Sequence, residues 1–247
     1  MEKKLRALLL KTLGLEQYLS VVSDAYIRLI RARFMQKKYP ELFFLKQIIK
    51  PGFVCIDIGA NVGYYSTFLS QYAGKNGHVH AVEPVDLFSR LLKNNARKFA
   101  LQNITFYQTA LGGENKKIQM GTPTIDGVFR HGLTKIVDEK ESQHLHTYQV
   151  DMRVPDELFS SLTHFDFLKC DVEGYEVFII PHFLKTLAQF KPLIQMEISS
   201  EENRKQIFDL FIPLGYSVCK LHQYALQKMN INDAINYDGG DFYFTVN

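Results

Sequence analysis

Residues 54–66 read Val-Cys-Ile-Asp-Ile-Gly-Ala-Asn-Val-Gly-Tyr-Tyr-Ser, an apolar run that ends at a glycine-containing turn. The run from Val54 to Ile58 is typical of a strand buried on both faces, as at the centre of a parallel sheet. Gly59 and Gly63 allow a tight turn, and Asn61 is placed to cap a following helix. A strand, a glycine turn and a helix N-terminus form a cofactor crevice at the carboxyl edge of a doubly wound sheet.

The spacing of the glycines separates two classes of cofactor. A dinucleotide loop needs Gly-x-Gly-x-x-Gly, because its second glycine admits a pyrophosphate and its third packs helix on strand. Asn61 and Tyr64 occupy those two positions, which disfavours an NAD-dependent oxidoreductase. The pattern Asp57-x-Gly59-x-Asn61-x-Gly63 resembles instead the nucleoside-binding loop of class I methyltransferases, which use S-adenosylmethionine (SAM).

A second acid follows at the distance that this interpretation requires. Residues 78–83 form a predicted strand that ends in Glu83, about 20 residues beyond the glycine turn, and Pro84 stops the strand. A carboxylate at such a strand end accepts hydrogen bonds from both hydroxyls of a ribose. We therefore expect Glu83 to bind the ribose, and a solvated strand end is the alternative.

A second polar group follows the predicted strand at residues 165–170. The chain there reads Phe-Asp-Phe-Leu-Lys-Cys and continues Asp-Val-Glu-Gly-Tyr-Glu to residue 176. Asp171 is thereby delivered to the same sheet edge, with Glu173 close behind. Lys169 lies inside the apolar run, which is costly unless its ammonium reaches a carboxylate such as Asp171 or Glu173.

These motifs together resemble the FkbM family of SAM-dependent methyltransferases, over residues 53–246. The resemblance is carried by Asp57–Gly63, Glu83-Pro84, Ala110-Leu-Gly112 and Leu168–Glu176. It implies O-methylation of a hydroxyl on a sugar, glycan, glycolipid or related natural product. The cofactor ligands that it implies are Asp57, Gly59, Asn61, Gly63, Glu83 and Pro84, and its rim motif is Lys169, Asp171 and Glu173.

Methyl transfer to an alcohol requires removal of the hydroxyl proton, by a general base or with the help of a metal ion. Asp171 is the first candidate for the base, because it is expected to face the reacting rim. Glu173 is the alternative, and Lys169 is expected to hold the acid in place. His131 or His144, in the long segment 121–147, is a further candidate.

A second scheme places a divalent ion, Mg²⁺, between Asp171 and Glu197, the acid near the end of a predicted strand at 192–198. Oxygen ligands on neighbouring strand ends suit this ion. In the other interpretation, Glu197 simply accepts hydrogen bonds at a strand end. The pair His144-x-His146 lacks a third nearby ligand, so it indicates zinc only weakly.

The order of elements predicts an α/β fold with a seven-stranded sheet and one antiparallel strand in a C-terminal hairpin, and the resemblance implies that this is the Rossmann-like fold of class I methyltransferases. Strands and helices alternate except in the polar stretch 112–145, where only a short strand at 117–120 is expected. The predicted strands are 53–58, 78–83, 104–109, 165–170, 192–198, 216–221 and 242–246. The predicted helices are 61–72, 86–99, 174–186 and 201–213, with none between the last two strands.

Residues 1–50 form a basic, helical N-terminal extension, followed by a methyltransferase domain at 51–247. The extension carries eleven Lys/Arg and four Asp/Glu, a net charge of +7, whereas the remaining chain carries −4. Residues 16–38 are amphipathic, which suits either packing on the domain or on a second subunit, or peripheral contact with a membrane. A homodimer is therefore one of the expected alternatives.

Composition excludes several other classes. No apolar stretch is long enough for a transmembrane segment, and the basic start lacks the apolar core of a signal peptide. Three isolated cysteines, Cys55, Cys170 and Cys219, argue against a disulfide framework. We therefore expect a cytoplasmic protein, at most peripheral at the inner membrane surface. The slightly acidic domain has no basic footprint for nucleic acid.

Overall fold

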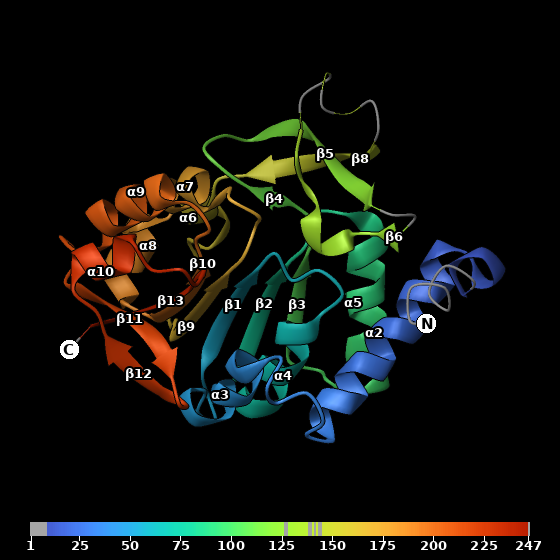
Figure 1. The fold of residues 1–247 in the computed structure, drawn as a ribbon, viewed down its shortest axis with the longest axis horizontal. Helices are drawn as coiled ribbons and strands as arrows, with labels where there is room; N and C mark the ends of the chain where they lie inside the picture. The colour runs from blue at the N-terminus through green and yellow to red at the C-terminus, as the bar shows by residue number, and fades with distance from the viewer. Residues whose placement is uncertain (1–8, 126–127, 138–139, 141, 143–144, 247) are drawn as a thin grey trace.

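An eight-stranded sheet forms the centre of the protein (Figure 1). The computed structural model describes residues 9–125, 128–137, 140, 142 and 145–246. The strand order is β12-β11-β13-β10-β9-β1-β2-β3. The strands are β1 (Val54–Ile58), β2 (His78–Val82), β3 (Ile104–Tyr107), β9 (Phe167–Cys170), β10 (Leu193–Glu197), β11 (Tyr216–His222), β12 (Ala225–Lys228) and β13 (Asp241–Val246).

The predicted seven strands are all present, and β13 runs antiparallel to both of its neighbours. The five adjacent strands β3, β2, β1, β9 and β10 pair in parallel, so their carboxyl ends meet at one edge. The prediction missed an eighth strand, β12, and a short helix, α10 (Ile231–Ile235), between β11 and β13. Strand β12 has no buried face, and therefore no apolar alternation that marks a strand in sequence.

Helices cover both faces of this sheet. Alternate residues of β1 pack on opposite sides, Cys55 toward α3 and α4 and Ile56 toward α7, α8 and α9. The helices are α3 (Pro40–Ile48), α4 (Tyr64–Ala73), α5 (Asp86–Lys98), α6 (Pro155–Leu158), α7 (Glu176–Ile179), α8 (Leu184–Phe190) and α9 (Glu201–Phe211). All three cysteines are buried and free.

Two helix predictions are wrong in detail. The single helix expected at 174–186 is divided into α7, a 3₁₀ turn at Ile180–His182 and α8. Pro181 lies at this division, where it has no N–H to continue an α-helix. Asn61 does not cap α4, because that helix begins three residues later and its N-cap is Gly63.

The stretch expected to be polar and mostly irregular forms a second sheet instead. Its order is β4-β8-β5-β6, with β7 paired to β5, and Figure 1 shows it above the carboxyl ends of β1, β2 and β3. The strands are β4 (Ala110–Leu111), β5 (Lys116–Ile125), β6 (Val128–Phe129), β7 (Lys135–Ile136) and β8 (Leu145–Arg153). Much of β5 and β8 is exposed or half-buried, so the periodic apolar signal of a strand is weak here.

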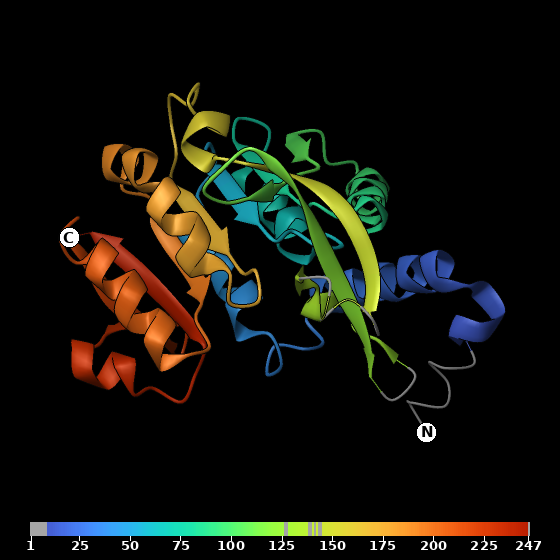
Figure 2. The ribbon, with the colours of Figure 1, turned by 90° about the horizontal axis from the view of Figure 1, so that it is seen from above.

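The N-terminal helix α2 (Leu15–Arg31) lies along α5 on the outside of the domain (Figures 1 and 2). Its Tyr18 and Leu19 pack in one cluster with Phe88 of α5, and Asn95 Nδ2 donates to Ser23 Oγ over 3.0 Å. The alternative in which this apolar face packs on the domain is therefore confirmed. The division of the chain at residue 50 and the membrane contact through residues 16–38 stay predictions. Within the described ranges no helix combines the length and apolar character needed to cross a membrane.

Candidate active site

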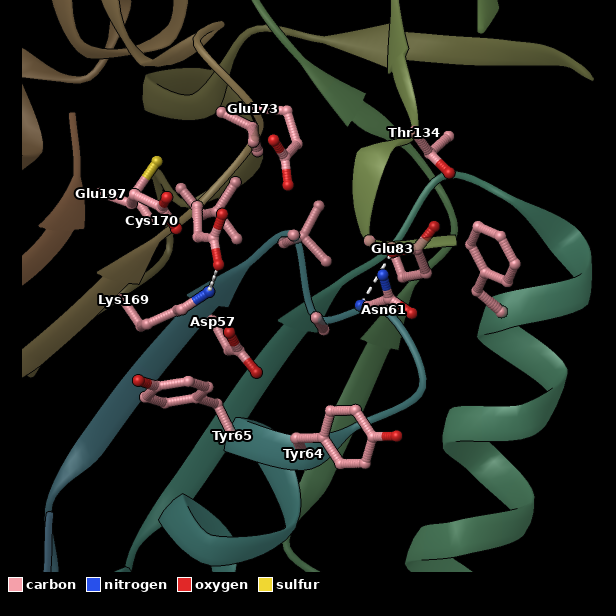
Figure 3. A pocket seen from close by; sticks show the side chains of 18 of the residues that line it. Asp57, Asn61, Tyr64, Tyr65, Glu83, Thr134, Lys169, Cys170, Glu173 and Glu197 are labelled. Carbon is pink, nitrogen blue, oxygen red and sulfur yellow. Dashed lines mark hydrogen bonds and ion pairs between the residues drawn. The ribbon is translucent and has the colours of Figure 1, made fainter. Parts of the chain in front are cut away.

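A cavity of about 460 Å³ lies at the carboxyl edge of the main sheet. The loops after β1, β2, β3 and β9 and the end of β10 line it, together with side chains of α3 and α4 and the 3₁₀ turn η1 (His131–Leu133). Ligands bind at this edge in doubly wound sheets, where strand ends and helix N-termini converge. Figure 3 shows the side chains that point into it.

The glycine loop after β1 forms one wall of this cavity. Gly59, Asn61 and Gly63 have left-handed backbones, with φ of 80°, 50° and 92°. Glycine adopts this conformation freely, and asparagine tolerates it. A Cβ on Gly59 would overlap the backbone carbonyl oxygen of Asp171, and one on Gly63 would overlap the side chain of Leu92. The two glycines are thus required both by conformation and by close packing.

Glu83 fixes the shape of this loop from the end of β2. Its carboxylate accepts from the backbone N–H groups of Asn61 and Val85, each over 2.8 Å. The side chain is only 5% exposed, and burial raises the pKa of Glu83 to about 7 although both N–H groups lower it. Each carboxylate oxygen keeps a further lone pair for a ligand hydroxyl. Pro84 follows directly and also lines the cavity.

Asp57 lies fully buried beneath the loop. Ser66 Oγ donates to its Oδ2, but its Oδ1 has no hydrogen-bond partner among the residues that the structure describes. Burial raises the pKa of Asp57, while Lys169 and Ser66 oppose that effect. A buried carboxylate oxygen without a donor is costly, so this atom is suited to accept from a ligand.

An ion pair of Lys169 and Asp171 lies at the carboxyl end of β9. Lys169 Nζ lies 2.7 Å from Asp171 Oδ2 and 4.7 Å from the ring centroid of Tyr65. Burial by itself lowers the pKa of Lys169, but the charges of Asp171 and Asp57 outweigh it and raise the pKa. The expected partner of the buried ammonium is thus Asp171, and the alternative pair with Glu173 is not formed.

Glu173 lies at the rim with an uncommon backbone. Its φ is 54°, a left-handed conformation that is strained for residues other than glycine and concentrates at functional sites. Burial raises the pKa of Glu173 to about 7, and the charges of Asp171 and Glu197 add to the effect. The buried carboxylate of Glu176 anchors the turn by accepting from Val172 N–H over 2.9 Å.

His131 comes from the second sheet and contacts the glycine loop. Its Nδ1 lies 2.8 Å from Asn61 Oδ1, and its backbone oxygen accepts from Asn61 Nδ2 over 3.1 Å. Because the amide oxygen can only accept, Nδ1 carries the proton. Burial lowers the pKa of His131 to about 4. His144, the other histidine predicted as a candidate base, lies outside the described residues. The predicted pair His144-x-His146 therefore lies partly outside them as well.

Two acids that the motifs did not single out also line the cavity, namely Glu41 of α3 and Asp241 of β13. Asp241 is the register partner of Glu197 across β10 and β13. A reversed strand begins at the edge where its neighbour ends, so the first residue of the C-terminal strand was a signal for this position. Glu41 had no such signal, because it comes from the N-terminal extension.

A family model described as the methyltransferase FkbM domain matches residues 57–234. The chain belongs to the FkbM methyltransferase family. Residues 57–234 therefore form a methyltransferase domain of the family that the sequence motifs resemble. The α/β fold with a large mixed sheet is the expected class I fold.

Individual relatives of this FkbM-family protein are distant. A protein-L-isoaspartate O-methyltransferase of Methanosarcina mazei is 33% identical over 54 residues, which are 22% of each chain. An FkbM methyltransferase structure from Methylobacillus flagellatus has 15% identity and a TM-score of 0.49, over 82% of this chain and 50% of that one. A SAM-dependent O-methyltransferase structure from Thermotoga maritima has 15% identity and a TM-score of 0.47, over 84% and 65%. The chain spans less than two thirds of each relative's length.

The FkbM-family site fits SAM on three structural observations. The loop residues Gly59, Ala60 and Asn61 line the cavity directly. Glu83 offers a carboxylate for ribose hydroxyls, and the unpartnered oxygen of Asp57 is suited to a donor group of the ligand. The loop and the Glu83 carboxylate are already joined by the Asn61 hydrogen bond, so this wall is preorganised.

Burial of Glu83 predicts a measurable pH effect on stability. The pKa of Glu83 in the folded protein, about 7, lies above its ordinary value of 4.5. Between these two pH values the folded state keeps a proton that the unfolded chain releases. The free energy of unfolding of the wild type therefore falls as the pH rises from 4.5 to 7. Glu83→Gln removes this cost. The free energy of unfolding of the variant minus that of the wild type is expected to increase by about 3 kcal/mol between pH 4.5 and 8. Urea titrations of both ligand-free proteins measure it, and a constant difference would contradict the burial argument.

Proposed function

We propose that the protein transfers the methyl group of SAM to a hydroxyl of a sugar, glycan, glycolipid or related natural product. The observation that carries the proposal is the acidic rim of Asp171 and Glu173, placed directly beside the nucleoside loop at Gly59. When bound, SAM supplies a methyl group on a positively charged sulfur. The side chains of the rim then have to orient the acceptor hydroxyl and remove its proton.

We assign the removal of the hydroxyl proton to Glu173 as general base, rather than to Asp171, the first candidate from the sequence. A general base works best when its pKa is near the operating pH, and the pKa of Glu173 is raised to about 7. Asp171 is instead held by the ammonium of Lys169, which lies 2.7 Å from its Oδ2. In this proposal Asp171 and Lys169 position the rim, and the strained backbone of Glu173 aims its carboxylate.

His131 has a different role in the proposal. With a pKa lowered to about 4 it is neutral at physiological pH and a weak base. Its hydrogen bonds to Asn61 tie the second sheet to the glycine loop. We therefore assign His131 to positioning of the loop, not to proton transfer.

Metal assistance by Mg²⁺ between Asp171 and Glu197 is the second mechanism. The described part of the chain contains no group of three His, Cys, Asp or Glu residues arranged to hold a metal ion, so the base mechanism has the stronger support. Methyl transfer that persists in excess EDTA is expected. Transfer that stops with EDTA and returns with Mg²⁺ would favour the metal scheme.

The proposed function is tested by binding and transfer together. Calorimetry is expected to show binding of SAM and none of NAD, and deuterated SAM is expected to label a hydroxyl in a panel of sugars, glycolipids and polyketides. Binding of NAD without SAM would instead support an oxidoreductase. Binding of SAM with no labelling of any acceptor would support the remaining alternative, an inactive cofactor-binding module that serves as a scaffold.

Glu173→Gln is expected to lower kcat by about 10²–10⁴-fold, the usual contribution of a general base. Affinity for SAM should change little, because the glycine loop and Glu83 are untouched. In the wild type kcat is expected to rise with pH up to about 7, where Glu173 loses its proton. The kcat of the variant should not show this rise. Stopped-flow or mass-spectrometric rates across pH measure it.

Two further variants complete this test. Glu202→Gln, on an exposed position of α9, should retain the wild-type rate and pH profile. Asp171→Asn should impair turnover less than Glu173→Gln. If the rise of kcat with pH is absent in Asp171→Asn but present in Glu173→Gln, the base is Asp171.

A further inference from the structure

A row of polar side chains crosses the main sheet beneath the cavity. The cross-strand register places Asp57, Lys169, Gln195 and Tyr243 in line on β1, β9, β10 and β13. All four are buried and lie on the face covered by α3 and α4, since Gln195 donates to Tyr65 and Tyr243 packs on Phe44. Two residues nearer the carboxyl edge lie Asp171, Glu197 and Asp241, and the buried Asp57, Lys169 and Gln195 form the floor of the cavity that they line.

The rim above the end of this row is strongly acidic. Glu197 and Asp241 are direct partners on antiparallel strands, an arrangement in which like charges destabilise a sheet. Burial, together with the charge of Glu41, raises the pKa of Asp241 to about 6. Burial and the charges of Asp171 and Asp241 likewise raise the pKa of Glu197. A hydrogen bond with Gln195 and the charge of Lys169 offset this effect at Asp241 only in part.

An independent feature of the floor indicates a ligand at the same place. Gln195 lines the cavity and is 1% exposed. Its Nε2 donates to Tyr65 over 2.9 Å, whereas its Oε1 has no partner in the described part of the chain. A buried amide oxygen without a donor is costly, and this one lies two residues before Glu197 on the same face of β10.

The charge of Lys169 compensates these acids only in part, because it lowers the pKa of Glu197 and of Asp241 while both pKa values stay raised. Lys169 is bonded to Asp171 and flanked by Asp57. SAM contributes a sulfonium and an ammonium against one carboxylate, and its place is the loop at Gly59 on β1. Glu197, Asp241 and the Gln195 oxygen belong to β10 and β13, two and three strands away in the sheet order.

We propose that the acceptor bears a protonated primary amine as well as the methylated hydroxyl, and that Glu197, Asp241 and Gln195 bind this ammonium. The inference rests on the proposed function and adds the acceptor class, an amino sugar or a related amino alcohol. A primary ammonium has three donors and no acceptor, which matches two carboxylates and one amide oxygen. It also neutralises the repulsion between the facing acids.

A matched pair of sugars tests the subsite. The protein is saturated with S-adenosylhomocysteine and titrated calorimetrically with methyl glucosaminide or methyl glucoside, which differ by an ammonium in place of one hydroxyl. The glucosaminide is expected to bind roughly tenfold or more tightly than the glucoside, as one partly buried charge pair provides. Glu197→Gln and Asp241→Asn should each remove most of this preference, and the exposed control Glu202→Gln should keep it.

Three results would overturn the inference. They are equal binding of the two sugars, no binding of the glucosaminide, and binding of Mg²⁺ alone that is lost in Glu197→Gln without any preference between sugars. Folding of the variants is checked by thermal unfolding, and both should melt no lower than the wild type because each relieves a like-charge pair. Failure of S-adenosylhomocysteine itself to bind would count against the proposed function, whereas its binding without ammonium preference refutes only the subsite.

Discussion

Gly59→Ala is expected to weaken SAM binding by at least about a hundredfold and to destabilise the fold by about 2–5 kcal/mol. The methyl group would overlap the backbone carbonyl of Asp171, which cannot rotate away as a side chain can. The backbone of Gly59 also has φ of 80°, which costs any other residue further energy. Relief requires the end of β9 to move, and with it the ion pair of Lys169 and Asp171.

Gly52→Ala is the matched control for this variant. Gly52 has φ of 93°, but a Cβ there meets no atom within 4 Å. The variant should therefore lose only the stability that the left-handed backbone costs a residue other than glycine, about 1–2 kcal/mol, and it should keep the wild-type affinity for SAM. Urea unfolding and calorimetry separate the two effects. Equal losses in both variants would show that contact with Asp171 has no part in the requirement for glycine.

Lys169→Met is expected to destabilise the protein by about 3–5 kcal/mol at neutral pH. The variant leaves the fully buried Asp57 and the neighbouring Asp171 without their shared cation. Protonation of Asp57 relieves that charge, so the loss should shrink as the pH falls toward the raised pKa of Asp57. The double variant Lys169→Met with Asp57→Asn should recover part of the loss at neutral pH.

Lys205→Met provides the comparison for burial. Lys205 Nζ also lies 2.7 Å from a carboxylate, that of Glu201, but both side chains are more than half exposed. Exposed pairs of this kind are worth about 0–1 kcal/mol, so this variant should unfold almost as the wild type does. Similar losses from Lys169→Met and Lys205→Met in urea titrations would refute the electrostatic explanation.

The predictions that held depend on local patterns. The run Val54–Ile58 is apolar because β1 is covered on both faces, and a buried central strand has little choice of residues. The positive φ angles of Gly59 and Gly63 are a local requirement of the turn. The spacing to Glu83 follows from one helix and one strand, so it too could be counted along the chain.

The predictions that failed concern segments with weak local patterns. Strand β12 and the second sheet keep exposed residues on much of their surface, so neither shows the alternation that a half-buried strand normally displays. The break at Pro181 was visible in the sequence, but the apolar residues on both sides favoured one continuous helix. Asn61 suited a helix cap by residue type, yet its side chain bonds to Val62 and His131 instead.

Short spacings along β1, β2 and β9 were enough to identify the family and to predict the wall that we propose holds SAM, because such spacings are counted along the chain. Other groups of the cavity come together only in the folded protein. Glu41, Gln195, Glu197 and Asp241 come from α3, β10 and β13, and Asp241 reaches this edge because β13 runs in reverse beside β10. The pKa values of Glu83 and Glu173 are likewise set by burial and by neighbouring charges, which depend on distances in space and not on distance along the chain.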